Sequence, residues 1–296
     1  MDIEEVAEKT YRIEVFDQRI DSLFAIYFIN EGEGVLIEPG PASMIPHIQE
    51  ALKQLGMTDL GFIIPTHIHI DHGGAIGSLA QLFPNAKVFV HPKGTKHVID
   101  PSRLIESTKM AFGDDFEDRY GPIIPVPESQ MVIPHDEEVL SINGRELQFF
   151  HAPGHAPHHI AIFDRKTEGL FSGESLGVPR RGLESIPLPT AAPPSFDMED
   201  YSKTIEKLKQ LRPKLLFYSH NGTGKNPEEL ISIVAGNTKN VGDIILKALK
   251  EGESVETINA RLTEQICNSF YKDEADIIWT MTVHGYIHYF QKKGQV

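Results

Sequence analysis

The stretch Thr66-His67-Ile68-His69-Ile70-Asp71-His72-Gly73-Gly74 decides the fold of this chain. It follows residues 62–65, which read as a short buried strand, and it precedes residues 75–83, whose apolar periodicity predicts a helix. The alternate spacing of His67 and His69 turns both imidazoles to one side of extended backbone. Asp71 and His72 come after the bend and can face a second point nearby. This strand-to-helix loop therefore predicts ligands for two metal ions, because imidazole and carboxylate bind zinc, iron(II) and manganese.

Two later loops carry further histidines. They are Pro153-Gly154-His155 and Tyr218-Ser219-His220-Asn221-Gly222, and each lies where a predicted strand gives way to a glycine-bearing loop. Each metal ion at the first loop still needs a third protein ligand. These loops can share one edge of the fold, where His155 and His220 are candidates for that ligand.

The rest of the chain divides into two successive batches of strands and helices. The first contains a helix over residues 43–55, and a proline-rich connector at residues 121–134 precedes the second. Residues 177–196 are crowded with Pro, Gly, Ser and Ala, which predicts a long ordered loop or a lid. Asp200 or Ser202 is expected to begin the next helix. The predicted strands cover residues 11–16, 23–29, 34–38, 62–65, 87–91, 138–142, 146–152, 159–164, 169–173 and 215–219, and residues from 226 onward are almost wholly helical.

Length and composition indicate a globular protein. At 296 residues, one large domain with helical additions is expected. Hydrophobic residues make up 40% and charged residues 24%, and no apolar run approaches the roughly 20 residues of a membrane span. The acidic start lacks the features of a secretory signal, and the one cysteine, Cys267, excludes an internal disulfide framework. We therefore expect a protein of the reducing cytoplasm that does not bind membranes.

The charge balance favours one class of partner. The formal net charge is -14. Binding to a nucleic-acid backbone depends mainly on Lys and Arg displacing phosphate counterions, so this acidic balance opposes it. A small-molecule substrate is expected instead.

Taken together, these motifs resemble those of the metallo-β-lactamase superfamily, and the resemblance runs from about residue 11 to 222. The superfamily's first motif, His-x-His-x-Asp-His, is met in full by the residues quoted above. The resemblance implies an α/β fold of four layers, αβ/βα, with a catalytic domain over residues 1–225 and a helical extension over residues 226–296 packed on it. It also implies two divalent metal ions, one held by His67, His69 and His155 and the other by Asp71, His72 and His220.

The chain departs from the family pattern at one ligand. The resemblance implies a carboxylate that bridges both metal ions, normally an aspartate after a strand and a glycine, and Leu170-Phe171-Ser172-Gly173-Glu174 carries Glu174 there. The extra methylene moves the carboxylate away from the backbone, so the loop must retreat or the metal spacing must change. Bridging, binding of one metal ion, and no binding are all open for Glu174.

The implied activity is hydrolysis. Two cations, zinc first and iron or manganese as alternatives, lower the pKa of a shared water so that a bridging hydroxide attacks an ester, thioester, lactone, amide or phosphodiester. Asp71 and Glu174 would orient this nucleophile. The chain is similar to the glyoxalase II-like thioesterases in its first motif and at His155, which favours a small ester, thioester or lactone over a phosphodiester.

Two other classes stay open. A non-haem di-iron oxygen-binding or redox protein occurs in a branch of the same superfamily, but that branch typically has Glu where His69 stands. A metal-binding protein without turnover is the other alternative, prompted by Glu174 and by the C-terminal helices. These helices pack on the domain, or they form a lid or a homodimer contact. His158 and His159 are predicted to support the ligands or to start a strand, and His284 and His288 to lie on a surface or in a substrate pocket.

Overall fold

The computed structural model describes residues 1–180, 183–266 and 275–296, so Cys267 lies outside the described residues. The chain forms two compact units. The first comprises residues 1–151, 158–173 and 213–225, and the second comprises residues 152–157, 174–212 and 226–296. The expected domain boundary lies at residue 225, and two segments before it, residues 152–157 and 174–212, belong to the second unit. The expected division into a catalytic domain and a helical extension stays a prediction.

A seven-stranded sheet forms one half of the first unit, in chain order. Neighbouring strands from β1 to β4 are antiparallel and those from β4 to β7 are parallel. The carboxyl ends of β4, β5 and β6 consequently lie at the same edge, and the first histidine loop follows β5. The strands are β1 (Asp2–Ala7), β2 (Thr10–Asp17), β3 (Ser22–Ile29), β4 (Val35–Ile37), β5 (Phe62–Ile64), β6 (Lys87–Phe89) and β7 (Met131–Val132).

A six-stranded sheet forms the other half of this unit, in the order β15-β14-β11-β10-β9-β8. Only β11 and β14 pair in parallel. The two sheets share a buried apolar core in which the rings of Phe171 and Phe217 stack at 4.5 Å and Tyr27 packs edge-on against Phe171. The strands are β8 (Val139–Ile142), β9 (Arg145–His151), β10 (Ile160–Asp164), β11 (Gly169–Gly173), β14 (Leu215–Tyr218) and β15 (Thr223–Gly224).

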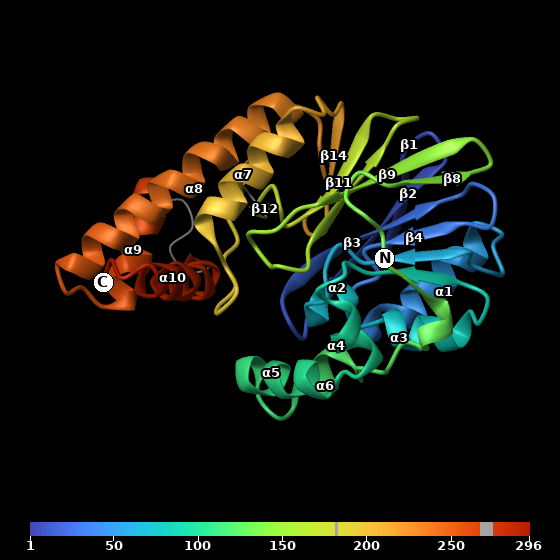
Figure 1. Cartoon of the computed structure of the whole chain (residues 1–296), viewed down its shortest axis with the longest axis horizontal. Helices are drawn as coiled ribbons and strands as arrows, with labels where there is room; N and C mark the ends of the chain where they lie inside the picture. The colour runs from blue at the N-terminus through green and yellow to red at the C-terminus, as the bar shows by residue number, and fades with distance from the viewer. Residues whose placement is uncertain (181–182, 267–274) are drawn as a thin grey trace. The chain divides into compact units, whose positions relative to one another are not determined.

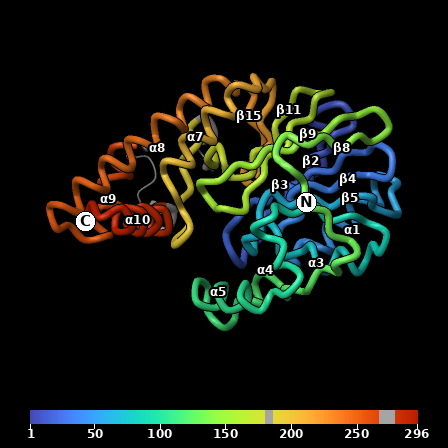
Figure 2. Tube along the Cα trace, in the orientation of Figure 1, coloured from blue at the N-terminus to red at the C-terminus, as the bar shows by residue number. Residues whose placement is uncertain are grey.

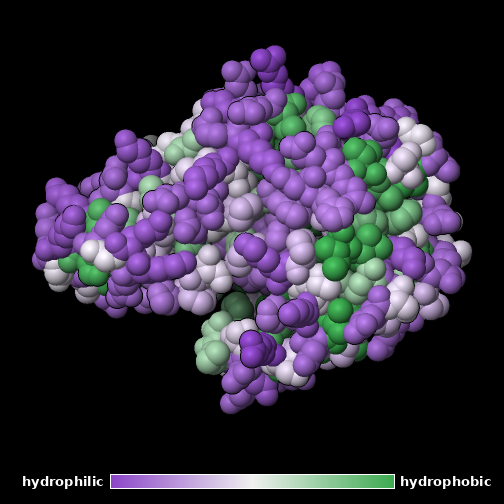
Figure 3. Space-filling view, viewed as in Figure 1, coloured by the Kyte–Doolittle hydropathy of each residue, from purple (hydrophilic) through white to green (hydrophobic). Residues whose placement is uncertain are grey.

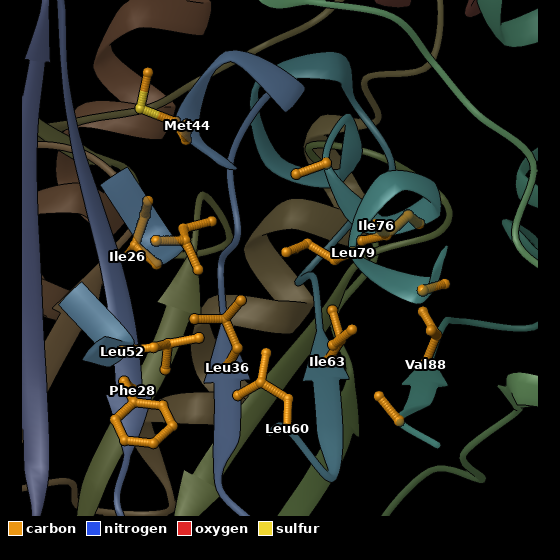
Figure 4. Close-up of a cluster of buried hydrophobic side chains, with 14 of the residues drawn as sticks. Ile26, Phe28, Leu36, Met44, Leu52, Leu60, Ile63, Ile76, Leu79 and Val88 are labelled. Atoms are coloured by element: carbon orange, nitrogen blue, oxygen red, sulfur yellow. The ribbon is translucent and has the colours of Figure 1, made fainter. Parts of the chain in front are cut away.

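Helices cover the outer face of the seven-stranded sheet (Figure 1). The predicted helix over residues 43–55 is α1 (Ile45–Gln54), which buries Ile48 and Leu52. In the same cluster α3 (Ile76–Leu82) buries Ile76 and Leu79, which Figure 4 shows together with Leu52. Each such side chain contributes about 1.5–3 kcal/mol on burial. A short helical turn, η1 (Ala42–Met44), precedes α1, and the remaining helical segments of this unit are α2 (Ile70–Gly73), α4 (Thr95–Ile99), α5 (Ser102–Phe112), α6 (Phe116–Tyr120) and η2 (Glu128–Gln130).

The second unit consists mainly of helices. It contains α7 (Met198–Lys209), α8 (Pro227–Lys250), α9 (Val255–Ile266) and α10 (Ala275–Lys292), and α7 and α8 lie side by side (Figure 2). The predicted α/β class with C-terminal helices is confirmed. The predicted start of α7 at Asp200 or Ser202 is wrong, because the Asp197 carboxylate accepts the Glu199 and Asp200 N–H groups at 3.1 Å and caps the helix earlier.

The segment expected to be a long loop contains a hairpin. β12 (Val178–Arg180) pairs antiparallel with β13 (Leu183–Leu188). Pro179 and Pro187 concealed these strands, because proline lacks an N–H donor and is rare inside sheets. A sheet of only two strands consists entirely of edges, where proline is tolerated.

The surface of the described residues is in keeping with the composition. Hydrophilic residues predominate on the face that Figure 3 shows. None of the described helices has the length and apolar character that crossing a membrane requires.

Candidate metal centre

The first two predicted ligands lie in the loop after β5. The His67 Nε2 atom is 3.0 Å from His69 Nδ1, and the Thr66 hydroxyl is 3.1 Å from His67 Nδ1. The chain then turns so tightly that a Cβ on Gly74 would lie 2.4 Å from the Ile70 carbonyl oxygen, so only glycine fits there. The two imidazoles thus direct one nitrogen each toward a common point, as the alternate spacing predicts.

A second group lies in the same unit. Ligating atoms of Asp71, His72 and His220 all lie within 4.8 Å of one another. The Asp71 Oδ2 atom is 3.4 Å from His72 Nε2 and 3.6 Å from His220 Nε2. Residues more than 140 positions apart therefore meet where β14 ends and α2 begins.

Two side chains contact the ring of His220. The Ser22 hydroxyl lies 3.2 Å from His220 Nδ1, and the ring of Phe24 packs against the imidazole at 5.3 Å. The Tyr27 hydroxyl donates to the Tyr218 carbonyl oxygen at 2.7 Å and fixes the end of β14. These contacts leave Nε2 directed at Asp71.

The donor set fits a divalent cation. Two ligand atoms about 2.1 Å from one tetrahedral zinc ion are about 3.4 Å apart. The separations around Asp71, 3.4 and 3.6 Å, match this value, and that between His67 and His69, 3.0 Å, is slightly shorter. Nitrogen and oxygen donors without thiolate suit zinc, iron(II) or manganese.

Charge around Asp71 favours its ionised form. Burial raises the pKa of this carboxyl, but the imidazoles of His72 and His220 outweigh burial and hold the pKa well below its ordinary value. Asp71 is therefore a carboxylate at neutral pH and can bind a cation without first losing a proton.

Glu38 is a functional candidate that the sequence did not reveal. It follows β4 directly and is buried, with a left-handed backbone at φ +57° that a non-glycine residue rarely adopts. One carboxylate oxygen accepts the Thr66 N–H at 2.6 Å and the other lies 2.5 Å from His72 Nδ1. Glu38 thus fixes the backbone before His67 and directs Nε2 of His72 toward Asp71. The signal in the sequence was the position of Glu38 at the end of a predicted strand, residues 34–38.

The remaining two predicted ligands lie together in the second unit. The His155 Nε2 atom is 2.8 Å from Glu174 Oε2, and His155 Nδ1 is 3.1 Å from the Thr190 carbonyl oxygen. His155 and Glu174 are both buried. The carboxylate and the imidazole are close enough to contact one cation.

The other four histidines considered in the sequence analysis divide into two kinds. The ring of His159 stacks on His67 at 4.8 Å, and that of His158 lies perpendicular to His69 at 5.4 Å, directly before β10 begins. Both therefore pack on predicted ligands. His284 and His288 are exposed on α10, and neither belongs to a group of three ligating side chains within the part of the chain that the structure describes.

Several known proteins are similar to this chain in sequence. The sequence model of the metallo-beta-lactamase superfamily matches residues 24–220. The metallo-beta-lactamase fold-containing protein ST1585 of Sulfurisphaera tokodaii is 28% identical over 166 residues, which are 55% of this chain and 61% of the relative. The atrochrysone carboxyl ACP thioesterase of Aspergillus fumigatus is 20% identical over 252 residues, which are 79% of this chain and 67% of the relative. The matches to the first two curated relatives span only about three fifths of their lengths, 61% and 60%.

Solved structures share the fold across nearly the whole chain. The metallo-beta-lactamase family protein TTHA1429 from Thermus thermophilus gives a TM-score of 0.74 at 19% identity and covers 98% of this chain and 95% of that one. The structure of ST1585 gives 0.67 at 21% identity, with 96% and 98% covered. This likeness confirms the predicted αβ/βα fold.

Proposed function

The chain belongs to the metallo-β-lactamase superfamily, and on that premise we propose that it is a metal-dependent hydrolase of a small ester, thioester or lactone. The observation that carries the proposal is the meeting of Asp71, His72 and His220 at separations suited to one cation. The paired nitrogens of His67 and His69 add to it. A thioesterase among the sequence relatives favours an acyl substrate.

We propose two divalent ions with the ligands that the family resemblance implies. One ion would be held by His67, His69 and His155 and the other by Asp71, His72 and His220, and Glu174 would supply the remaining carboxylate. Zinc suits these donors, with iron and manganese as the alternatives. In such a site the metal ions supply an activated water and stabilise negative charge on the substrate oxygen.

The chain's own residues orient the attacking water and one of the metal ligands. Asp71 is ionised, so its carboxylate can accept a hydrogen bond from the attacking water and fix its direction. Glu38 keeps His72 in the tautomer that presents the Nε2 lone pair to a cation, since Nδ1 faces the Glu38 carboxylate at 2.5 Å.

Turnover by protein loaded with zinc, manganese or iron tests this proposal. We expect one of these forms to hydrolyse a member of a panel of acyl esters, thioesters and lactones, and chelation to remove the activity. Hydrolysis of phosphodiesters alone would reassign the substrate class. Iron-specific oxygen consumption without hydrolysis would support the redox alternative instead.

The Glu38→Gln substitution is expected to weaken zinc binding by about 10–100-fold, the usual effect of losing a hydrogen-bond partner of a metal ligand. Glutamine is isosteric, but its amide has one acceptor oxygen, whereas Thr66 N–H and His72 each bond a separate oxygen of Glu38. Competition with a chromogenic chelator measures this affinity.

The matched control is Glu50→Gln. Glu50 is exposed on α1, where its carboxylate accepts a hydrogen bond from Gln54 on the same helix. Zinc affinity should not change in this variant. Equal affinity in Glu38→Gln and Glu50→Gln would show that Glu38 does not support His72.

A further inference from the structure

A buried tyrosine of the second unit holds the loop that carries Glu174. Tyr201, on α7, is fully buried. Its hydroxyl donates to the Glu174 carbonyl oxygen at 2.9 Å and accepts the Gly177 N–H at 2.8 Å. The Gly177 N–H also approaches the Glu174 carbonyl oxygen at 3.2 Å. One hydroxyl therefore closes both ends of the turn that follows β11.

The same helix also holds the loop that carries His155. The backbone of Gly154 has φ +135°, and a Cβ there would lie 2.3 Å from Tyr201 Cα, so only glycine fits between the loop and the helix. The Asp197 N–H donates to the Gly154 carbonyl oxygen at 2.9 Å, and the Thr204 hydroxyl donates to that of Pro153 at 2.6 Å. Both loops are thus fixed to one rigid element.

These hydrogen bonds matter because the chain has a glutamate, Glu174, where the family usually has an aspartate. Glutamate has an additional rotatable bond, so its carboxylate samples more positions unless the main chain is fixed. Tyr201 bonds the main chain of Glu174 and leaves the carboxylate to reach His155 Nε2 at 2.8 Å. A tyrosine hydroxyl can donate one hydrogen bond and accept another at the same time, as that of Tyr201 does here.

We propose that Tyr201 is a positioning residue that sets the main chain of Glu174 relative to His155, so that the longer carboxylate and the imidazole contact the same cation. This inference rests on the proposed metal-dependent function. Tyr201 lies outside the ligand set, and its hydrogen bonds explain how this chain accommodates glutamate.

Tyr201→Phe tests the inference, because it removes the hydroxyl and keeps the ring. We expect zinc affinity to fall by about 10-fold or more, as for other residues that orient a ligand. The value of kcat on the best substrate of the panel should fall with it, while KM changes little because Tyr201 is buried away from solvent. Chelator competition reports the zinc affinity independently of turnover.

Tyr286→Phe is the matched control. Tyr286 is equally buried in the same unit, and its hydroxyl donates to the Thr238 carbonyl oxygen at 2.9 Å. Each substitution removes one buried hydroxyl, with two hydrogen bonds lost in Tyr201→Phe and one in Tyr286→Phe, so both should lower the thermal stability. Only Tyr201→Phe should bind zinc more weakly than the wild type. Wild-type zinc affinity in Tyr201→Phe would overturn the inference and leave the proposed function intact.

Glu174→Asp provides a second test that does not depend on Tyr201→Phe folding. If the main chain is fixed at the distance that glutamate needs, the shorter aspartate should bind zinc about 10-fold more weakly, although aspartate is the usual family residue. Equal or tighter binding by Glu174→Asp would overturn the inference. A wild-type protein that binds no zinc, manganese or iron would overturn the proposed function and this inference together.

Discussion

His69→Ala is expected to lower kcat/KM for the best acyl substrate by about 10³-fold or more. The His69 Nδ1 atom lies 3.0 Å from His67 Nε2, and alanine removes one of the two nitrogens directed at their common point. A catalytic metal ion contributes several kcal/mol to transition-state stabilisation, and about 4 kcal/mol corresponds to this factor. Kinetics and metal content measured on the same preparation check the result.

His284→Ala is the control for this substitution. His284 is an exposed histidine on α10, and its replacement should change neither metal content nor turnover. Full turnover by His69→Ala at the wild-type metal content would mean that the hydrolysis takes place without this group of histidines.

Arg145→Ala is expected to lower the free energy of unfolding by about 3–5 kcal/mol, the cost of leaving one partner of a buried ion pair alone. Arg145 and Asp164 form an ion pair with side chains only 1% and 0% exposed. The guanidinium also donates to the Thr10 hydroxyl at 2.6 Å and the Glu8 carbonyl oxygen at 3.0 Å. The substitution therefore leaves the Asp164 charge buried without its main partner. Urea unfolding followed by circular dichroism measures the change.

The neighbouring pair supplies the comparison. Arg165 and Glu146 lie 2.7 Å apart, but their side chains are 44% and 45% exposed, so water already solvates both charges. Arg165→Ala should cost at most about 1 kcal/mol. Similar decreases in the free energy of unfolding in Arg145→Ala and Arg165→Ala would show that burial does not determine how much each ion pair stabilises the fold.

The sequence predicted the local part of the candidate site well. His67 and His69 alternate on extended backbone, and that spacing is sufficient to direct two nitrogens to one side. Asp71 and His72 follow within the same loop, so their turn toward a second point depends on local geometry alone. The meeting with His220 was inferred from its position after a strand, and the structure places it 3.6 Å from Asp71.

The supporting residues could not be predicted in the same way. Glu38 lies 28 positions before Thr66, and only the parallel pairing of β4 with β5 brings its carboxylate to the loop. In the sequence, Tyr201 looks like any other apolar position of an amphipathic helix. The periodicity shows that the side chain is buried, but it does not show what the hydroxyl bonds. Hydrogen bonds between distant segments leave no period in the sequence.

Errors in the predicted elements have a similar origin. The hairpin of β12 and β13 was missed because its prolines resemble loop residues, although edge strands tolerate them. The start of α7 was placed too late because several residues near it can serve as a cap, and the choice of Asp197 depends on its extended backbone at φ -133°.

The decisive measurement is the metal content of the purified protein after loading with zinc and removal of the excess. We expect about two zinc ions per chain in the wild type and a lower content in a variant that lacks Asp71, with folding unchanged by circular dichroism. A folded wild-type protein that retains no zinc, manganese or iron would contradict this expectation.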